Sequence, residues 1–438
     1  MRNIIVILAA VIPLSRLAAQ NIQFVEYDLP NGLHVILHED HSTPIVAVTV
    51  MYHVGSKNER VGRTGMAHFF EHLLFEGSEN IGRGEYAKYV ESAGGGLNAN
   101  TSQDRTFYYD LLPSNQLELG LWLESERMLH AKVENVGIET QREVVKEEKR
   151  LRVDNQQYGN LFAETLDHAF DVHPYSWPPI GSMEDLNAAQ DKDFVDFYKT
   201  FYVPNNAVLS IAGDLTMDQA KALVEKYFSG IPRGKKEIPR PTQVEPLNKG
   251  EVRDTIYGKD QLTLIVNAWH IPAQGTKDFY AVDMLNQLLS QGESSRLNKA
   301  LVEESQVALF SGAFTYNTEH PGLTLAYSLV NMTAQPQDVE KAVNEQVELV
   351  KTQPISDREL QKLRNQVEND FVSRNSSVAG IAESLANYYM YFGETNLINT
   401  EIQRYMQVTK EDIQRVANTY YNKDNSVVLY FMNRDKAQ

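Results

Sequence analysis

Two histidines and a glutamate lie close together near the start of the chain, in residues 68–72, which read His-Phe-Phe-Glu-His. In a helix, residues four apart share one face, so His68 and His72 would point the same way, one turn apart. Glu71 would project near that face but rotated from His72. Two imidazoles can hold a zinc ion while a neighbouring carboxylate accepts a proton from water. This spacing therefore predicts a metal-binding helix that carries its own base.

A catalytic zinc ion usually takes three protein ligands, so the two histidines need a partner from elsewhere in the chain. The chain has no cysteine, which leaves histidine and carboxylate ligands. The segment 141–150 is predicted to be helical and is rich in glutamate. Its positions 141, 144, 145 and 148 share one face, which reads Gln-Val-Val-Glu, so Glu148 is the acid on the apolar side. Glu148 is the predicted third ligand, and Glu147 is the alternative.

Length and composition are those of an ordinary globular protein of more than one domain. The chain has 438 residues, of which 42% are hydrophobic and 23% charged. Its formal net charge is -17, which argues against nucleic-acid binding because that function needs a basic surface. An acidic protein would weakly favour neutral or basic peptides as partners.

Residues 1–20 have the pattern of a secretory signal. Arg2 supplies the positive charge, residues 4–14 form an apolar run, and small residues precede a predicted cleavage before Gln20 or Asn21. The apolar run is too short to cross a bilayer, which takes about 20 residues in a helix. No later segment of the sequence is long and apolar enough to do so. We therefore expect an exported, periplasmic protein without a membrane span in its mature chain.

Short β-type runs and amphipathic helices alternate along the mature chain. Residues 24–29 and 33–37 flank Asn31-Gly32, which predicts a β-hairpin. The Pro-rich stretch 233–252 has few large apolar residues and is predicted to be a linker. The other predicted elements are strands over 43–52 and 208–213 and helices over 115–129, 138–152 and 217–228.

The two parts of the chain on either side of the linker share a pattern. Thr200 matches Thr419 and Asn206 matches Asn425, both at an offset of 219 residues, and each pair lies in a helix-then-strand segment. The offset is about half the mature chain, so we expect a duplicated α+β domain. The predicted organisation is a signal peptide (1–20), a metal-binding domain (21–232), a linker (233–252) and a second, homologous domain without the histidine motif (253–438).

These features together resemble one family, the M16 pitrilysin/insulinase zinc metallopeptidases. The inverted His-x-x-Glu-His motif, the distant Glu148 after Val-Val, and Leu-Pro-Asn-Gly-Leu at 29–33 carry the resemblance. It covers essentially the whole mature chain and is strongest to the short two-domain branch that includes the mitochondrial processing peptidase. It implies two α/β-sandwich halves of the LuxS/MPP-like metallohydrolase type, each an antiparallel-rich sheet flanked by helices.

The resemblance also implies a function and roles for residues. One zinc ion per chain would be held by His68, His72 and Glu148, with Glu71 as the general base. The expected activity is endopeptidase cleavage of peptides or unfolded polypeptides in a chamber between the halves. Residues 94–101 would form an edge strand whose main chain pairs with the substrate, and a plain Gly-rich turn is the alternative. The residues of that strand expected to contact substrate are Gly96, Leu97, Asn98 and Ala99.

The chain departs from the family pattern at two places. Family members commonly have a glutamate where this chain has Gln141, which we expect to hydrogen-bond a ligand from outside the coordination shell. Active members also carry an Arg after a Ser-Ser-Arg-Leu segment, here 294–297, and a Tyr seven residues later, which together stabilise the oxyanion. In this chain those positions are Val302 and Leu309, and neither side chain can donate a hydrogen bond.

This second departure predicts a heterodimer. The chain would be the zinc-bearing subunit, and a paralogous M16 subunit would supply the Arg and the Tyr; a homodimer is the other possibility. The competing interpretation is a non-catalytic scaffold or peptide-binding subunit, which the missing donors favour and the intact metal motif opposes.

Overall fold

A computed structural model of the protein describes residues 21–247 and 249–434. The predicted secretory signal, residues 1–20, lies outside these ranges. Within them, every helix is too short or too polar to traverse a bilayer.

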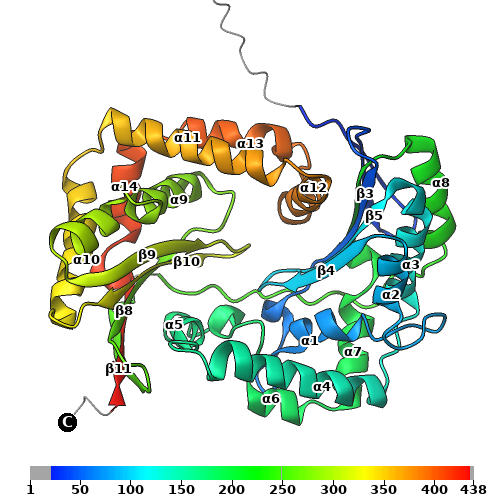
Figure 1. The fold of residues 1–438 in the computed structure, drawn as a ribbon, viewed down its shortest axis with the longest axis horizontal. Helices are drawn as coiled ribbons and strands as arrows, with labels where there is room; N and C mark the ends of the chain where they lie inside the picture. Colours follow the sequence, from blue (N-terminus) through cyan, green and yellow to red (C-terminus); the bar gives the residue numbers. More distant parts are fainter. Residues whose placement is uncertain (1–20, 248, 435–438) are drawn as a thin grey trace, which may run out of the picture.

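The described residues form two sheets, one in each half of the chain (Figure 1). The first has the strand order β1-β2-β6-β3-β5-β4 and the second β7-β11-β8-β10-β9. Within these sheets the β2–β6 and β7–β11 pairs are parallel and the others are antiparallel. The predicted α+β fold with antiparallel-rich sheets is confirmed. The strands are β1 Val25–Asp28, β2 His34–Glu39, β3 Ile45–Tyr52, β4 Gly96–Thr101, β5 Thr106–Pro113, β6 Ala207–Gly213, β7 Val252–Gly258, β8 Leu264–Ile271, β9 Ala308–Tyr316, β10 Gly322–Val330 and β11 Ser426–Asn433.

Helices pack on both faces of the two sheets. In the first half the apolar sides of α1, α3, α7 and α8 bury one face of the sheet, around Phe70, Leu121 and Phe194. The helices of that half are α1 Met66–Leu73, α2 Tyr86–Ser92, α3 Leu117–Leu129, α4 Asn135–Lys149, α5 Leu161–Ala169, α6 Met183–Ala188, α7 Asp191–Phe201 and α8 Met217–Phe228. Those of the second half are α9 Lys277–Ser290, α10 Pro336–Thr352, α11 Asp357–Arg374, α12 Val378–Phe392, α13 Leu397–Met406 and α14 Lys410–Tyr420.

The predicted duplication is visible in the element boundaries. β3 and β8, α7 and α14, and the starts of β6 and β11 all lie 219 residues apart. The predicted hairpin is present as β1 and β2, and its turn is closed by the Asn31 side chain, which accepts a hydrogen bond from Leu33 N at 3.1 Å. The described residues between α8 and β7 form no helix or strand, and the domain boundaries drawn from the sequence stay predictions.

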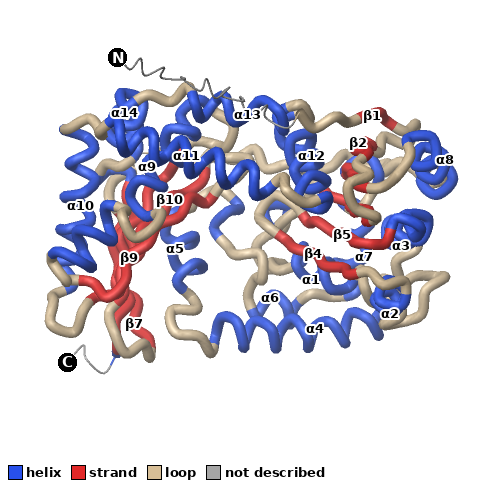
Figure 2. Tube along the Cα trace, turned by 45° about the horizontal axis from the view of Figure 1, so that its top comes forward, coloured by secondary structure: helices blue, strands red, loops and turns tan. Residues whose placement is uncertain are grey.

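One feature of the fold was not predicted. Each half contributes a helix that packs on the sheet of the other half. α12 packs on the first sheet, where Ile381 and Leu385 join a core with Met51 and Phe107. α5 packs on the second sheet, where Leu166 joins a core formed by strand residues of the second half. Figure 1 shows α12 beside β3 and β5, and Figure 2 shows α5 beside β9. The exchange fixes the two halves relative to each other.

A buried ion-pair network also joins the halves. Lys57, of which 1% of the side chain is exposed, lies with its Nζ 2.8 Å from Asp104 Oδ1. The same Nζ pairs with Glu319 of the second half. Asp104 Oδ2 accepts a hydrogen bond from the main-chain N–H of Glu319 at 3.0 Å, and Asp104 Oδ1 accepts one from Tyr175 at 2.6 Å. Carboxylates from both halves therefore share one buried ammonium, and Glu319 is also 2.6 Å from His53 Nε2.

We expect Lys57→Met to lower the free energy of unfolding by about 3–5 kcal/mol, because it removes the buried cation that Asp104 and Glu319 share. Urea denaturation followed by circular dichroism measures this change. Lys192→Met is the matched control, because Lys192 is 84% exposed in its pair with Asp196 and its loss should leave the midpoint unchanged. Equal midpoints for the two variants would contradict a structural role for the buried network.

Candidate metal centre

Helix α1 presents its polar residues together because its apolar residues face the core. Phe69 and Phe70 are fully buried, while His68, Glu71 and His72 lie on the opposite, partly buried side. The helix begins after Gly65, whose φ of 87° is left-handed and suits glycine. The carboxylate of Glu59 accepts hydrogen bonds from the main-chain N–H groups of Gly65 and Ala67, both at 2.8 Å, which fixes the start of the helix.

Three side chains from two helices converge at this face. Glu148 lies in the last turn of α4, which packs against α1 through Val145 in the first core. Its Oε2 is 3.0 Å from His72 Nε2 and 3.7 Å from His68 Nε2. Within the described ranges, His68, His72 and Glu148 are the cluster of potential metal ligands, with ligand atoms all within 4.8 Å of one another. The alternative Glu147 points away and pairs with Arg150 at 3.0 Å.

The protonation states suit a cation at this position. Burial, and next the charge of His72, lowers the pKa of His68 to about 4, so its imidazole is neutral at pH 7 and has a lone pair to offer. A hydrogen bond from His72 lowers the pKa of Glu148, which stays ionised. Two imidazoles and one carboxylate are a donor set that zinc takes in catalytic sites, so the residues present fit the ion.

Glu71 lies between this cluster and the edge of the sheet. Its Oε2 accepts a hydrogen bond from Thr101 Oγ1 at 2.7 Å, and Thr101 is the last residue of β4. Burial raises the pKa of Glu71, although the hydrogen bond from Thr101 opposes this shift. A carboxyl group with a raised pKa is better matched to proton transfer near neutral pH. Glu71 is thus placed to act beside the cluster and not as a member of it.

The segment expected to contact substrate is a strand at the sheet edge. β4 pairs with β5 alone, so its other side offers main-chain donors and acceptors. Gly94 and Gly95 precede the strand, and a Cβ on Gly95 would lie 2.5 Å from Leu111 O, so the close turn requires glycine. Gly96 is exposed and a Cβ there would meet no atom within 4 Å, which leaves room for a second backbone.

Two details of the predicted ligand helix were wrong. Gln141 does not hydrogen-bond a ligand; its Nε2 donates to Glu76 Oε1 at 2.5 Å, because α4 crosses α1 beyond the histidines at that point. Val144 was expected on the inward face with Val145, but 44% of it is exposed. The buried stripe of the helix is therefore narrower than the predicted face formed by residues 141, 144, 145 and 148. Glu143 and Glu147 lie on the exposed side of the helix.

Sequence reasoning missed a contact made by Arg152. This residue lies in the π-helical segment Arg150–Asp154 that continues α4, and its guanidinium Nη1 is 2.9 Å from Glu148 Oε1. The two oxygens of Glu148 are therefore divided between the histidines and Arg152. Arg152 also lines a cavity of about 790 Å³ with His68 and Trp177. The spacing of four residues between Glu148 and Arg152 on a predicted helix was the signal that could have found this ion pair.

The two positions that lack hydrogen-bond donors lie in the second half. Val302 is in the π-helical segment Asn298–Glu304 and packs against the core of that half. Leu309 is on β9, where it is 47% exposed. Neither side chain can donate a hydrogen bond, at positions where the family resemblance predicts an Arg and a Tyr.

Comparison with known proteins gives matches along most of the chain. A family model described as Insulinase (Peptidase family M16) matches residues 34–176, and one described as Peptidase M16 inactive domain matches residues 189–367. A protein named zinc protease PqqE from Helicobacter pylori is 32% identical over 409 residues, which are 92% of this chain and 91% of that protein.

Solved structures of related proteins have the same fold as this chain. A crystal structure of a protease from Helicobacter pylori has a TM-score of 0.90 at 30% sequence identity, covering 94% of this chain and 100% of that one. A structure titled peptidase M16 inactive domain from Pseudomonas fluorescens has a TM-score of 0.84 at 17% identity, covering 94% and 98%, and shows likeness of fold. By its sequence and its fold, this chain belongs to the M16 family of peptidases.

Proposed function

We propose that the chain is a zinc-dependent endopeptidase that cleaves peptides or unfolded polypeptides. The observation that carries this proposal is the convergence of His68, His72 and Glu148 beside Glu71, at the end of an unpaired strand edge. Relatives named zinc proteases support the metal and the reaction. Export to the periplasm is part of the proposal and rests on the pattern of residues 1–20.

The roles of the residues follow from their positions. His68, His72 and Glu148 would hold one zinc ion, which when bound acidifies water and polarises a carbonyl group. Glu71 accepts the proton of the attacking water and passes it to the leaving amine. The hydroxyl of Thr101 holds the Glu71 carboxylate on the side of β4. The main chain of β4, with Gly96, Leu97, Asn98 and Ala99, binds the substrate backbone by strand addition.

The second half leaves this site without oxyanion donors of its own at Val302 and Leu309. We therefore propose that a paralogous M16 subunit supplies an Arg and a Tyr, with a homodimer as the simpler assembly. The same apolar positions favour the competing function, a non-catalytic scaffold or peptide-binding subunit. Metal content separates the two functions, because a scaffold has no need of a zinc ion.

The purified chain should contain on the order of one zinc ion, and Glu148→Gln should lose most of it, because a neutral amide is a poor zinc ligand. Metal analysis after dialysis gives the stoichiometry. Glu147→Gln is the matched control: it removes a charge one residue away but should keep the metal, since Glu147 faces solvent. A metal-free parent chain would support the scaffold.

Glu71→Gln should keep the zinc ion and lower the rate of peptide cleavage by about 10²–10⁴-fold, because the proton acceptor is lost while the ligands stay. Cleavage of a fluorogenic peptide and metal analysis on the same sample measure the two effects. Activity equal to that of the parent would exclude Glu71 as the base.

The isolated chain should cleave peptides slowly, because each missing oxyanion donor costs about a hundredfold or more in rate. Adding a paralogous subunit with the Arg and the Tyr should restore the rate, and a version of that subunit with both residues changed to alanine should not. The readout is the turnover number at saturating partner. Full activity of the chain alone would contradict the need for a partner.

A further inference from the structure

Helix α1, which carries two of the candidate metal ligands, is too short to hold its shape without support. Its eight residues make about two turns, and a helix of that length is marginal unless packing stabilises it. Glu59 fixes its first turn. The last turn, which carries Glu71 and His72, is held from the sheet. The hydroxyl of Tyr108 on β5 donates a hydrogen bond to the main-chain oxygen of Phe70 at 2.8 Å.

The hydrogen bond from Tyr108 is buried and adds to the bonds of the helix. Tyr108 is fully buried, and burial raises its pKa well above the usual range, so the hydroxyl keeps its proton and remains a donor. The oxygen of Phe70 also accepts the main-chain N–H of Leu74 at 3.1 Å, so both of its lone pairs are used. This carbonyl group belongs to the residue directly before Glu71. The orientation of that turn therefore depends on Tyr108.

A buried cation supports the ring of Tyr108 and the end of α1 together. The guanidinium carbon of Arg127, whose side chain is fully buried, lies 4.1 Å from the centre of the Tyr108 ring and 4.5 Å from that of Phe75. Its nitrogens have no hydrogen-bond partner in the described structure, and its ion pair with Glu124 is 3.6 Å long. Aromatic faces attract a desolvated cation, so the rings hold Arg127 and Arg127 holds the rings. Because Phe75 lies just beyond the end of α1, these contacts join that end to Tyr108.

Tyr108 also belongs to the strand that pairs with the proposed substrate strand. In the β4–β5 ladder Tyr108 lies opposite Ala99, one of the residues expected to contact substrate. Thr101, at the end of β4, donates to the carboxylate of Glu71 at 2.7 Å. The two neighbouring strands thus hold the base in two ways, because Tyr108 fixes the main chain before Glu71 and Thr101 fixes its side chain. A peptide paired with β4 would lie at a set distance from Glu71.

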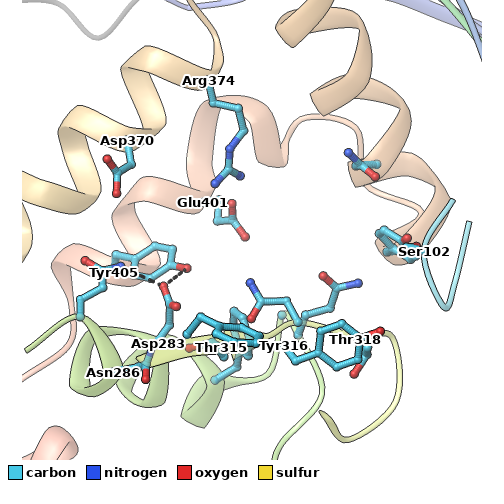
Figure 3. A pocket seen from close by; sticks show the side chains of 18 of the residues that line it. Ser102, Asp283, Asn286, Thr315, Tyr316, Thr318, Asp370, Arg374, Glu401 and Tyr405 are labelled. Atoms are coloured by element: carbon cyan, nitrogen blue, oxygen red, sulfur yellow. Dashed lines mark hydrogen bonds between the residues drawn. The ribbon is translucent and has the colours of Figure 1, made fainter. Parts of the chain in front are cut away.

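The duplicated second half has a hydroxyl group at the equivalent strand position. Val50 pairs with Tyr108 in the first sheet, and Trp269, which lies 219 residues after Val50, pairs with Thr324 in the second. Thr324 Oγ1 donates to Oδ1 of Asn286 on α9 at 2.9 Å. Figure 3 shows Asn286 among the side chains that line a cavity of the second half. In each half a strand hydroxyl therefore holds a helix of the same half, and in the first half that helix carries candidate metal ligands.

We propose that Tyr108 is a positioning residue that aligns α1 with the strand pair receiving the substrate. Its hydroxyl sets the orientation of the turn with Glu71 and His72 relative to the main chain of β4. The turn then does not have to be ordered when metal or peptide binds, which favours both metal affinity and reaction rate. The effect on rate rests on the proposed peptidase function, whereas the effect on the helix rests on the geometry of Tyr108 and Phe70.

The experiment compares Tyr108→Phe with Tyr198→Phe in the full chain. Tyr198 also stacks on Phe70, with ring centres 6.1 Å apart, but its hydroxyl donates to the main-chain oxygens of Arg127 and Met128 at the end of α3. Each substitution removes one hydrogen-bonded hydroxyl and keeps the ring, so the urea midpoints should fall by similar amounts. Tyr108→Phe alone should weaken zinc binding, by about fivefold or more, which is the effect of one hydrogen bond. Competition with a chromophoric chelator measures the affinity.

Two further measurements separate positioning from folding. At saturating zinc, Tyr108→Phe should lower kcat for a peptide by about fivefold or more and leave KM unchanged, because β4 still binds the peptide while Glu71 is less well placed. In the metal-free chain, amides of residues 66–74 should exchange hydrogen faster in Tyr108→Phe than in Tyr198→Phe. Equal zinc affinities, an unchanged kcat or equal exchange would each overturn the proposal. A parent chain without zinc would refute the proposed function, and the exchange measurement would then decide the role of Tyr108.

Discussion

The structure depends on the reciprocal packing of α5 and α12. Each of these helices covers the sheet formed by the other half of the chain. A sheet with helices on one face still has an apolar second face, which must be buried. α12 covers that face of the first sheet and α5 covers that of the second. Neither sheet is complete without the other half. The cluster of His68, His72 and Glu148 and the β4 edge therefore lie on a framework that both halves build.

The duplicated framework places side chains at corresponding positions, and the residue types decide what those positions do. In the first half the partly buried face of α1 carries His68 and His72, and a glutamate from α4 completes a set of potential metal ligands. In the second half the same places carry Gln287 and Gln291, with Asp370 on the crossing helix. The first set of side chains suits a metal cation, whereas the second has amides in place of the two imidazoles. The two halves therefore share a backbone arrangement but carry chemically different side chains at these positions.

Much of the fold and the core of the candidate site could be predicted because the signals are local. Helical spacing placed His68 and His72 together, and the apolar face of the helix predicted over 138–152 selected Glu148 over Glu147. The repeat offset predicted two similar halves. The partners across space could not be predicted: apolar periodicity in α5 and α12 predicts that they are buried, but not which sheet they cover. For the same reason the hydrogen bond from Gln141 to Glu76 was not foreseen.

The helix exchange has a consequence for the segment that connects the halves. Residues 229–247 and 249–251 form no helix or strand, and many of them are exposed, so a protease could cut the chain there. In an ordinary two-domain protein such a nick would release two separate domains. Here each fragment would keep a helix buried in the sheet of the other, so the nicked chain would stay together as a non-covalent complex. Conversely, a fragment made alone would expose one apolar sheet face and aggregate. The covalent connection is therefore more important for assembling the two halves than for holding them together.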